Sequence, residues 1–169
     1  MNTKILTLNK ERVTSLVVFI TLISVASIAP LFHNQPITGP IVNATLFIAV
    51  ALLGTETAIM VGLIPSLIAL SVGLLPAVLA PMVPFIMMGN ALMIWSFSVL
   101  NKKNFWAGII TASLLKFLFL WGPSTIAVNL LLKKEVASTV ATMMSWPQLW
   151  TAVVGGLIAF VVLKGMKKV

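Results

Sequence analysis

The sequence predicts an all-α membrane protein, a bundle of about six transmembrane helices with cytoplasmic N- and C-termini. Hydrophobic residues make up 60% of the chain and charged residues 8%, whereas an ordinary soluble domain is ~25% charged. The stretch from Ile41 to Leu100 carries one charged residue, Glu56. A bilayer with a hydrocarbon core of ~30 Å needs ~20 apolar residues for each crossing. Several crossings therefore follow one another in this stretch.

The first crossing is predicted at residues 13–32, directly after a polar and basic segment that ends at Arg12. A cleaved signal peptide is the competing interpretation, but the apolar region of a signal peptide is usually ~7–15 residues long and this run is longer. The segment from His33 to Pro40 is rich in Pro, Gly and Asn. It is predicted to be an external loop.

The second and third crossings are predicted at residues 41–53 and 56–72, with a turn at Gly54 between them. Pro65 falls inside the third crossing and predicts a kink. Residues 73–83 remain apolar but contain Gly and several prolines. Irregular backbone at membrane depth is tolerated where protein or a water-filled cavity covers it, so this segment is a candidate cavity wall.

The last three crossings are predicted at residues 84–100, 105–132 and 146–163. A short basic loop at 101–104 joins the first two of these, and a polar loop at 133–145 joins the last two. Trp121-Gly122-Pro123 marks a second possible break inside the fifth crossing. The whole chain, 1–169, forms a single transmembrane domain.

The distribution of basic residues predicts the orientation of the bundle. With six crossings, the side that carries both termini holds Lys4, Lys10, Arg12, Lys102, Lys103, Lys164, Lys167 and Lys168. The opposite side holds only Lys133 and Lys134. Lys and Arg accumulate in cytoplasmic loops, so both termini are expected in the cytoplasm.

Composition excludes several classes of function. Cysteine is absent, which rules out disulfides and cysteine-ligated iron–sulfur clusters. One histidine and three acidic residues are too few for an all-protein transition-metal site, so no metal and no cofactor are expected. The net charge of +8 does not indicate nucleic acid, because the basic residues form no stripe with aromatic partners. An enzyme is not expected.

Four short motifs give the chain a family resemblance: Thr38–Asn43 after the first crossing, Val61–Ser66 in the third, Gly73–Pro76 after it, and the basic turn Asn101–Asn104. With six crossings in under 200 residues, the chain resembles the substrate-binding S component of energy-coupling factor (ECF) transporters. The resemblance covers essentially the whole chain.

This resemblance implies a prokaryotic cell-membrane protein that binds a vitamin or a metal ion from outside. It also implies partners, a shared transmembrane T component and two ATPases. The chain has no G-x-x-x-x-G-K-[ST] motif, so ATP hydrolysis has to come from a partner. The family's Ala-x-x-x-Ala motif is absent from the first helix. Ala26, Ala29 and Glu56 are the candidate partner contacts, and Glu56 is also explained as an acid near the positive end of a helix.

Lys116 is the strongest single candidate for a site, because an ammonium group near the middle of a membrane costs several kcal/mol unless it is paired or hydrated. It either faces a cavity and holds an anionic group of a ligand, or snorkels or contacts a partner from the outside of the bundle. Three amides, Asn90, Asn129 and Gln148, lie within or near the last three crossings. Each either contacts a ligand or forms an interhelical hydrogen bond.

Aromatic and loop residues complete the list of candidates. Trp121 and Trp146 either stack on a flat heterocycle or anchor helix ends at the membrane interface. By the resemblance, His33, Asn34 and Gln35 lie in the loop that closes over the ligand, and solvation alone is the other explanation for them.

The sequence therefore favours a substrate-capture subunit that binds a small vitamin-like solute. The alternative is a non-catalytic membrane scaffold or assembly protein without a small ligand. A lone intramembrane cation with nearby amides and tryptophans favours a carboxylated or heteroaromatic vitamin over a metal ion.

Overall fold

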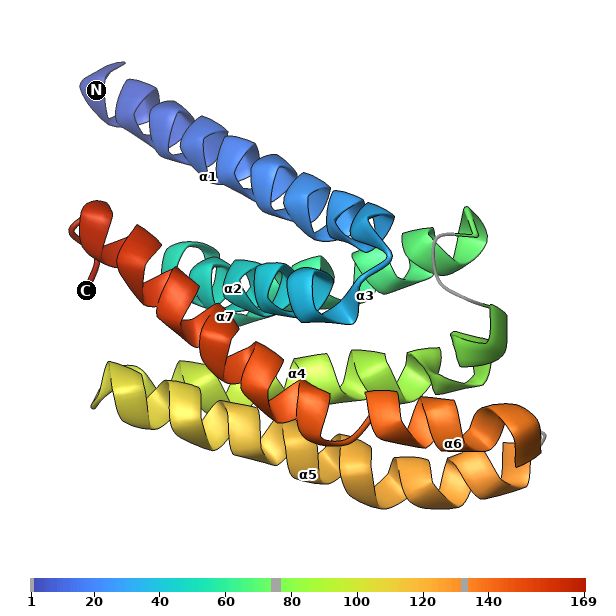
Figure 1. Ribbon diagram of the computed structural model, residues 1–169. Coiled ribbons are helices and arrows are strands. Elements are labelled where there is room, and N and C mark those ends of the chain that lie inside the picture. Colours follow the sequence, from blue (N-terminus) through green and yellow to red (C-terminus); the bar gives the residue numbers. More distant parts are fainter. Residues whose placement is uncertain (1, 74–76, 132–133) are drawn as a thin grey trace.

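The computed structural model describes residues 2–73, 77–131 and 134–169, and every regular element within these ranges is a helix (Figure 1). In chain order the elements are α1 (Asn2–Ile28), the 3-10 helix η1 (Ala29–Phe32), α2 (Gln35–Leu53), α3 (Thr55–Ser71), the 3-10 helix η2 (Ala77–Met82), α4 (Val83–Leu100), α5 (Phe105–Leu131), α6 (Lys134–Met143) and α7 (Trp146–Gly165).

Five segments are long and apolar enough to cross a membrane: Lys10–Phe32, Gln35–Leu53, Ala80–Leu100, Phe105–Gly122 and Val140–Gly165. The apolar part of α3 is shorter, Thr55–Ile68. The prediction of an all-helical, multi-pass membrane protein is confirmed at this level. The number of crossings and the orientation of the termini stay predictions.

Helix α2 is the centre of the bundle. Eight consecutive residues, 43–50, are buried, and a helix that is buried all round has neighbours on every side. Those neighbours are α1, α3, α4 and α7. Half of the residues in the most apolar stretch of α2 are buried, compared with 17% of those in the apolar stretch of α1. Helix α1 therefore lies at the edge of the bundle, as Figure 1 also shows.

Aromatic rings join three of these helices in the core. The ring centroids of Phe47 and Phe97 are 4.7 Å apart and those of Phe97 and Phe105 are 5.4 Å apart. Both pairs are edge to face, the arrangement that ring quadrupoles favour. This cluster links α2, α4 and the start of α5.

Glycines allow α7 to lie close against α2 and α5. A Cβ atom added at Gly155 would lie 2.7 Å from Asn43 Cβ and 2.8 Å from the backbone nitrogen of Ala44. One added at Gly156 would collide with Ile109 Cγ2 of α5. Small residues are the usual means of close helix approach in membranes, where van der Waals packing drives association.

Helix α6 is an element that the sequence analysis placed in a polar loop, and that prediction is wrong. Residues Ala137, Val140, Ala141 and Met144 recur at the spacing of one helical face. They pack in a small cluster with Leu120. Because the segment is short and otherwise polar, its apolar stripe was overlooked.

The predicted loop from His33 to Pro40 is also mostly helical, because α2 begins at Gln35 rather than Ile41. Pro36 lies in the first turn, where a missing N–H costs nothing. Pro40 follows one turn later and has no N–H to donate to the carbonyl of Pro36. That carbonyl is still in the first turn of the helix. Only His33 and Asn34 lie outside a helix here.

Two predicted breaks have different outcomes. Helix α5 continues through the Trp121-Gly122-Pro123 segment to Leu131, so no break occurs there. In the predicted irregular segment 73–83, residues 74–76 lie outside the described part of the chain, and 77–82 form η2. Pro65 lies inside α3, as predicted.

Both chain termini lie at the same end of the bundle (Figure 1). This end also contains the turn at Gly54 between α2 and α3, the loop 101–104, the start of α1 and the end of α7. Lys10, Arg12, Lys102 and Lys164 are all exposed there. The charge asymmetry that the sequence predicts thus coincides with the two ends of the folded bundle.

Replacing Gly155 by alanine tests the close packing of α7. The added methyl group meets backbone atoms of α2, which cannot rotate away, so we expect a loss of about 1–3 kcal/mol in unfolding free energy. Thermal unfolding of the detergent-purified protein measures this loss. Gly165→Ala in the same helix is the control, since nothing lies within 4 Å of its added Cβ atom. Equal melting temperatures for the two variants would contradict the packing described here.

Candidate functional site

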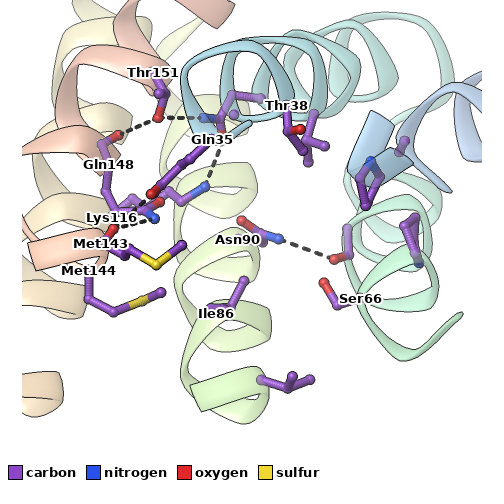
Figure 2. Close-up of a pocket in the computed structure, with 18 of the residues that line it drawn as sticks. Gln35, Thr38, Ser66, Ile86, Asn90, Lys116, Met143, Met144, Gln148 and Thr151 are labelled. Atoms are coloured by element: carbon purple, nitrogen blue, oxygen red, sulfur yellow. Dashed lines mark hydrogen bonds between the residues drawn. The ribbon is translucent and has the colours of Figure 1, made fainter. Parts of the chain in front are cut away.

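A cavity of about 280 Å³ opens among the helices in the half of the bundle away from the termini. Its wall comes from the end of α1, the starts of α2, α4 and α7, the middle of α3 and α5, and the end of α6. Figure 2 shows side chains from these helices around one space. No single helix forms this site, so it exists only in the folded bundle.

Lys116 extends from α5 to this cavity and is 3% exposed. Its Nζ donates a 2.6 Å hydrogen bond to Asn43 Oδ1 of α2. In the described part of the chain this is its one hydrogen-bond partner, and no carboxylate lies within ion-pair distance. An ammonium has three N–H donors, so two of them remain for another group.

Asn43 connects Lys116 to α7. Its Nδ2 lies 3.5 Å from Thr151 Oγ1 as a long hydrogen bond. Thr151 in turn donates to the carbonyl of Pro147, one turn back in α7, at 2.7 Å. All three side chains are at least nine-tenths buried. The close contact of α2 with α7 near Gly155 brings Asn43 and Thr151 within reach of each other.

Asn90 comes from α4 and is 3% exposed. Its Nδ2 donates to the carbonyl of Gly62 in α3 at 3.2 Å, while its Oδ1 has no hydrogen-bond partner among the described residues. Both Asn90 and Gly62 line the cavity. A buried polar atom without a partner is uncommon and calls for an explanation.

Gln35 and Gln148 lie at the start of α2 and α7, and both donate to the carbonyl of Met143 at the end of α6. The two distances are 2.9 and 3.0 Å. Met143 and Met144 also line the cavity. The two glutamines therefore hold the α6–α7 turn over one side of the cavity.

His33 and Asn34 also line the cavity, although both are exposed. His33 has a left-handed backbone, with φ of 47°, and this turn reverses the chain between η1 and α2. These two residues lie at the rim, where the cavity meets the surface. Their order in the chain places them beside Gln35.

The structure brings together six of the sequence-predicted site residues and leaves the two tryptophans apart. Lys116, Asn90, Gln148, His33, Asn34 and Gln35 line the cavity. Trp121 and Trp146 are 54% and 64% exposed and are not among its lining residues. Stacking of either tryptophan on a ligand in this cavity is therefore not supported. Asn129 is part of α5, but its side chain lies outside the described side chains.

The three candidate partner contacts lie in different surroundings. Ala26, near the end of α1, and Ala29, the first residue of η1, are 0% and 2% exposed, because α1 packs on α2 and α3 and η1 packs on α2. Ala26 also lines the cavity. In this conformation neither alanine offers a surface to a partner. Glu56 is exposed in the first turn of α3, in agreement with an acid near the positive end of a helix.

Several cavity residues were not among the sequence candidates. Asn43 and Thr151 are the most important of them, and Thr38 and Ser66 also line the wall. A polar side chain inside a long apolar run was the available signal for Asn43 and Thr151. That signal alone does not tell a ligand contact from an ordinary interhelical hydrogen bond.

The electrostatics of the cavity favour an anionic guest. Lys116 is the charged residue in its described lining, which contains no Asp or Glu. The lining also includes the first turns of α2 and α7, and the N-terminal ends of helices carry partial positive charge. No cluster of potential metal ligands occurs among the described residues. The surrounding wall is mostly apolar, as in small-molecule sites generally.

Comparisons with family models, curated proteins and solved structures found no match for this chain.

The bond between Lys116 and Asn43 is tested with a double-mutant cycle. Asn43→Ala leaves the buried ammonium without its partner, and the loss of a hydrogen bond to a charged group costs about 1.5–3 kcal/mol. In a Lys116→Met background the same substitution should cost much less, because no charge remains to be satisfied. Thermal unfolding of the four proteins in detergent gives the coupling.

Thr45→Ala is the matched control for this cycle. Thr45 is equally buried in α2, but its hydroxyl bonds to Ile41 within the same helix. Its effect should be the same with and without Lys116→Met. Additive effects of Asn43→Ala and Lys116→Met would contradict a direct contact between the two side chains.

Proposed function

We propose that this protein is the substrate-binding membrane subunit of an uptake transporter of the ECF type. It captures a small solute in the cavity around Lys116 and relies on partner ATPases for energy. The proposal depends mainly on one observation, the buried ammonium with unused donors at the wall of a 280 Å³ cavity. Ligand pockets usually measure ~300–1,000 Å³, so the solute is small.

The cost of burying Lys116 supports a role in binding. Removing an ammonium from water costs several kcal/mol, and one neutral amide does not recover that cost. A purely structural position would be filled at lower cost by an apolar side chain of similar volume. An anionic solute would use the two free N–H donors and supply the missing negative charge.

The side from which the solute enters follows from the charge asymmetry. Basic side chains gather at the end that carries both termini, and the cavity lies in the opposite half. Under the positive-inside rule the cavity then opens toward the exterior. Uptake is the direction that this arrangement favours.

The need for partners follows from the chemistry that the chain lacks. No nucleotide-binding motif occurs in the sequence, so the chain by itself can bind but cannot couple ATP hydrolysis to transport. In the family that it resembles, a T component and two ATPases provide this step. A scaffold without a ligand would need neither a cavity nor a buried cation.

A thermal-shift screen of the detergent-purified protein against water-soluble vitamins, their precursors, nucleobases, tryptophan and divalent metals tests solute capture. A true ligand at a hundredfold excess over its Kd stabilises the protein by ~2.7 kcal/mol. We expect a hit among the organic anions that is lost in Lys116→Met and retained in Thr45→Ala. A folded protein that no compound stabilises would favour the scaffold alternative.

The side and charge preference of the cavity can be measured without knowing the ligand. The chain has no cysteine, so Ser66→Cys in the cavity wall provides a single thiol. Anionic and cationic methanethiosulfonate reagents that do not cross membranes are added to intact cells. We expect the anionic reagent to react faster than the cationic one. Lys116→Met should slow the anionic reagent and speed the cationic one by roughly tenfold each, and so lower the rate ratio by about a hundredfold, since unit charges ~10 Å apart interact by ~1.7 kcal/mol at an effective dielectric constant of ~20.

Ser71→Cys, an exposed position near the end of the same helix, controls for general reactivity. Its rate ratio should not respond to Lys116→Met. Protection of Ser66→Cys in intact cells, with labelling only after the membrane is opened, would place the cavity on the cytoplasmic side and contradict uptake from outside.

A further inference from the structure

Asn90 has a fixed orientation that leaves one polar atom unused. Its Nδ2 donates to the Gly62 carbonyl at 3.2 Å. A carbonyl oxygen can only accept hydrogen bonds, so turning the amide over would place two acceptors together. The Oδ1 atom therefore stays on the other side of the amide group, where it has no partner among the described residues.

The neighbouring backbone explains why the Asn90 amide is held in place. A Cβ atom added at Gly62 would lie 3.6 Å from Asn90 Cβ and 3.0 Å from Ile94 Cδ1, so α3 and α4 meet closely here because residue 62 is glycine. Pro65 follows three residues later and has no N–H to donate to the Val61 carbonyl. The Val61 carbonyl, which lacks this backbone hydrogen bond, is therefore next in the chain to the Gly62 carbonyl that Asn90 contacts.

Several other polar side chains of the wall already have partners, whereas Ser66, His33 and Asn34, which have no side-chain hydrogen bond among the described residues, are partly or fully exposed. Gln35 and Gln148 donate to Met143, and Thr38 donates to the carbonyl of Ala29 at 3.0 Å. Among the buried groups of the described wall, two still have unused hydrogen-bonding atoms: the free N–H donors of Lys116 and the free acceptor oxygen of Asn90. They come from different helices, α5 and α4, and Figure 2 shows both side chains at the same space.

We propose that the ligand is a small organic anion that also carries an N–H or O–H hydrogen-bond donor. Its acidic group accepts from Lys116, its donor group bonds to Asn90 Oδ1, and its apolar body lies against the apolar wall that includes Val61, Ile86 and Met144. This inference rests on the proposed function and narrows it. Metal ions and organic cations are excluded by the lone positive charge, and anions without a donor leave Asn90 unsatisfied.

Asn90 is in this view a specificity residue. A site with a buried hydrogen-bonding group rejects an analogue that lacks the complementary group, because the buried group then remains unpaired. A neutral hydrogen bond of this kind changes affinity by about tenfold, and one to a charged group by ~10–100-fold. The two contacts can therefore be separated by their size and by the variant that removes each.

The test measures binding of three sets of matched small molecules, each built on a carbon skeleton of different size, to the purified protein. Each set contains the parent anion with a donor, its methylated form without the donor, and its uncharged amide. The parents are 4-hydroxybutanoate, 3-hydroxybenzoate and indole-3-acetate, and any hit from the vitamin screen is derivatised in the same way. Affinity is measured by titration calorimetry or by thermal shift.

For the set whose parent compound binds, we expect methylation of its N–H or O–H donor to weaken binding about tenfold and conversion of its carboxylate to the amide to weaken binding at least tenfold. Asn90→Leu should abolish only the methylation penalty, and Lys116→Met only the amidation penalty. Asn90→Ala serves as a second variant if Asn90→Leu does not fold. Ser113→Ala is the matched control, because Ser113 Oγ is also buried without a partner among the described residues but does not line the cavity.

The outcomes separate this inference from the proposed function. Equal binding of parent and methylated probes, or a methylation penalty that persists in both Asn90 variants, would overturn the role of Asn90 while leaving solute capture intact. Preferential binding of the uncharged amides would overturn the anion assignment in the same way. If neither these probes nor the vitamin screen stabilises the folded protein, solute capture fails and this inference fails with it.

Discussion

The buried ammonium of Lys116 is the interaction on which the arrangement of the bundle depends. A charge in an apolar interior requires a partner, and in this structure the partner is Asn43, held at 2.6 Å. Asn43 belongs to α2, the helix that has neighbours on all sides. Any displacement of α2 relative to α5 would leave the charge unsatisfied. The hydrogen bond from Lys116 to Asn43 therefore constrains the position of α2 relative to α5.

Close packing in one half of the bundle is accompanied by open space in the other. Gly155 and Gly156 let α7 touch α2 and α5 so closely that a single methyl group has no room. The cavity lies toward the end away from the termini, and α2 and α7 stay in close contact beside it at Gly39 and Thr151. The α6–α7 turn covers one side through the two glutamine bonds to Met143. The close contact of α2 with α7 positions Asn43 and Thr151 at the cavity wall.

The cavity combines features that oppose each other in a purely structural core. An apolar wall favours exclusion of water, yet Lys116 keeps unused donors and Asn90 keeps an unused acceptor at that wall. In a packed core both groups would destabilise the fold, because a buried donor or acceptor without a partner loses its hydrogen bonds to water. In a binding site each is satisfied when the ligand arrives, and the strength of that gain depends on the ligand's chemistry. On the proposed function, this complementarity rather than the size of the cavity would determine which solutes bind.

The sequence by itself determined the helical class, five of the helices that are long and apolar enough to span a membrane, and the position of Lys116 within an apolar run, because apolar length and an isolated charge are local properties of the chain. It misplaced the start of α2 and overlooked α6, since Pro36 is compatible with a first helical turn and a four-residue apolar stripe is a weak signal in a polar segment. The partners of Lys116 and the unused oxygen of Asn90 were decided only by tertiary structure. Residues 43 and 116 are far apart in the chain, and no periodicity reports which helices meet. Helix α7 packs closely on α2 at Gly155 and on α5 at Gly156, and such contacts are properties of packed surfaces and not of any single sequence segment.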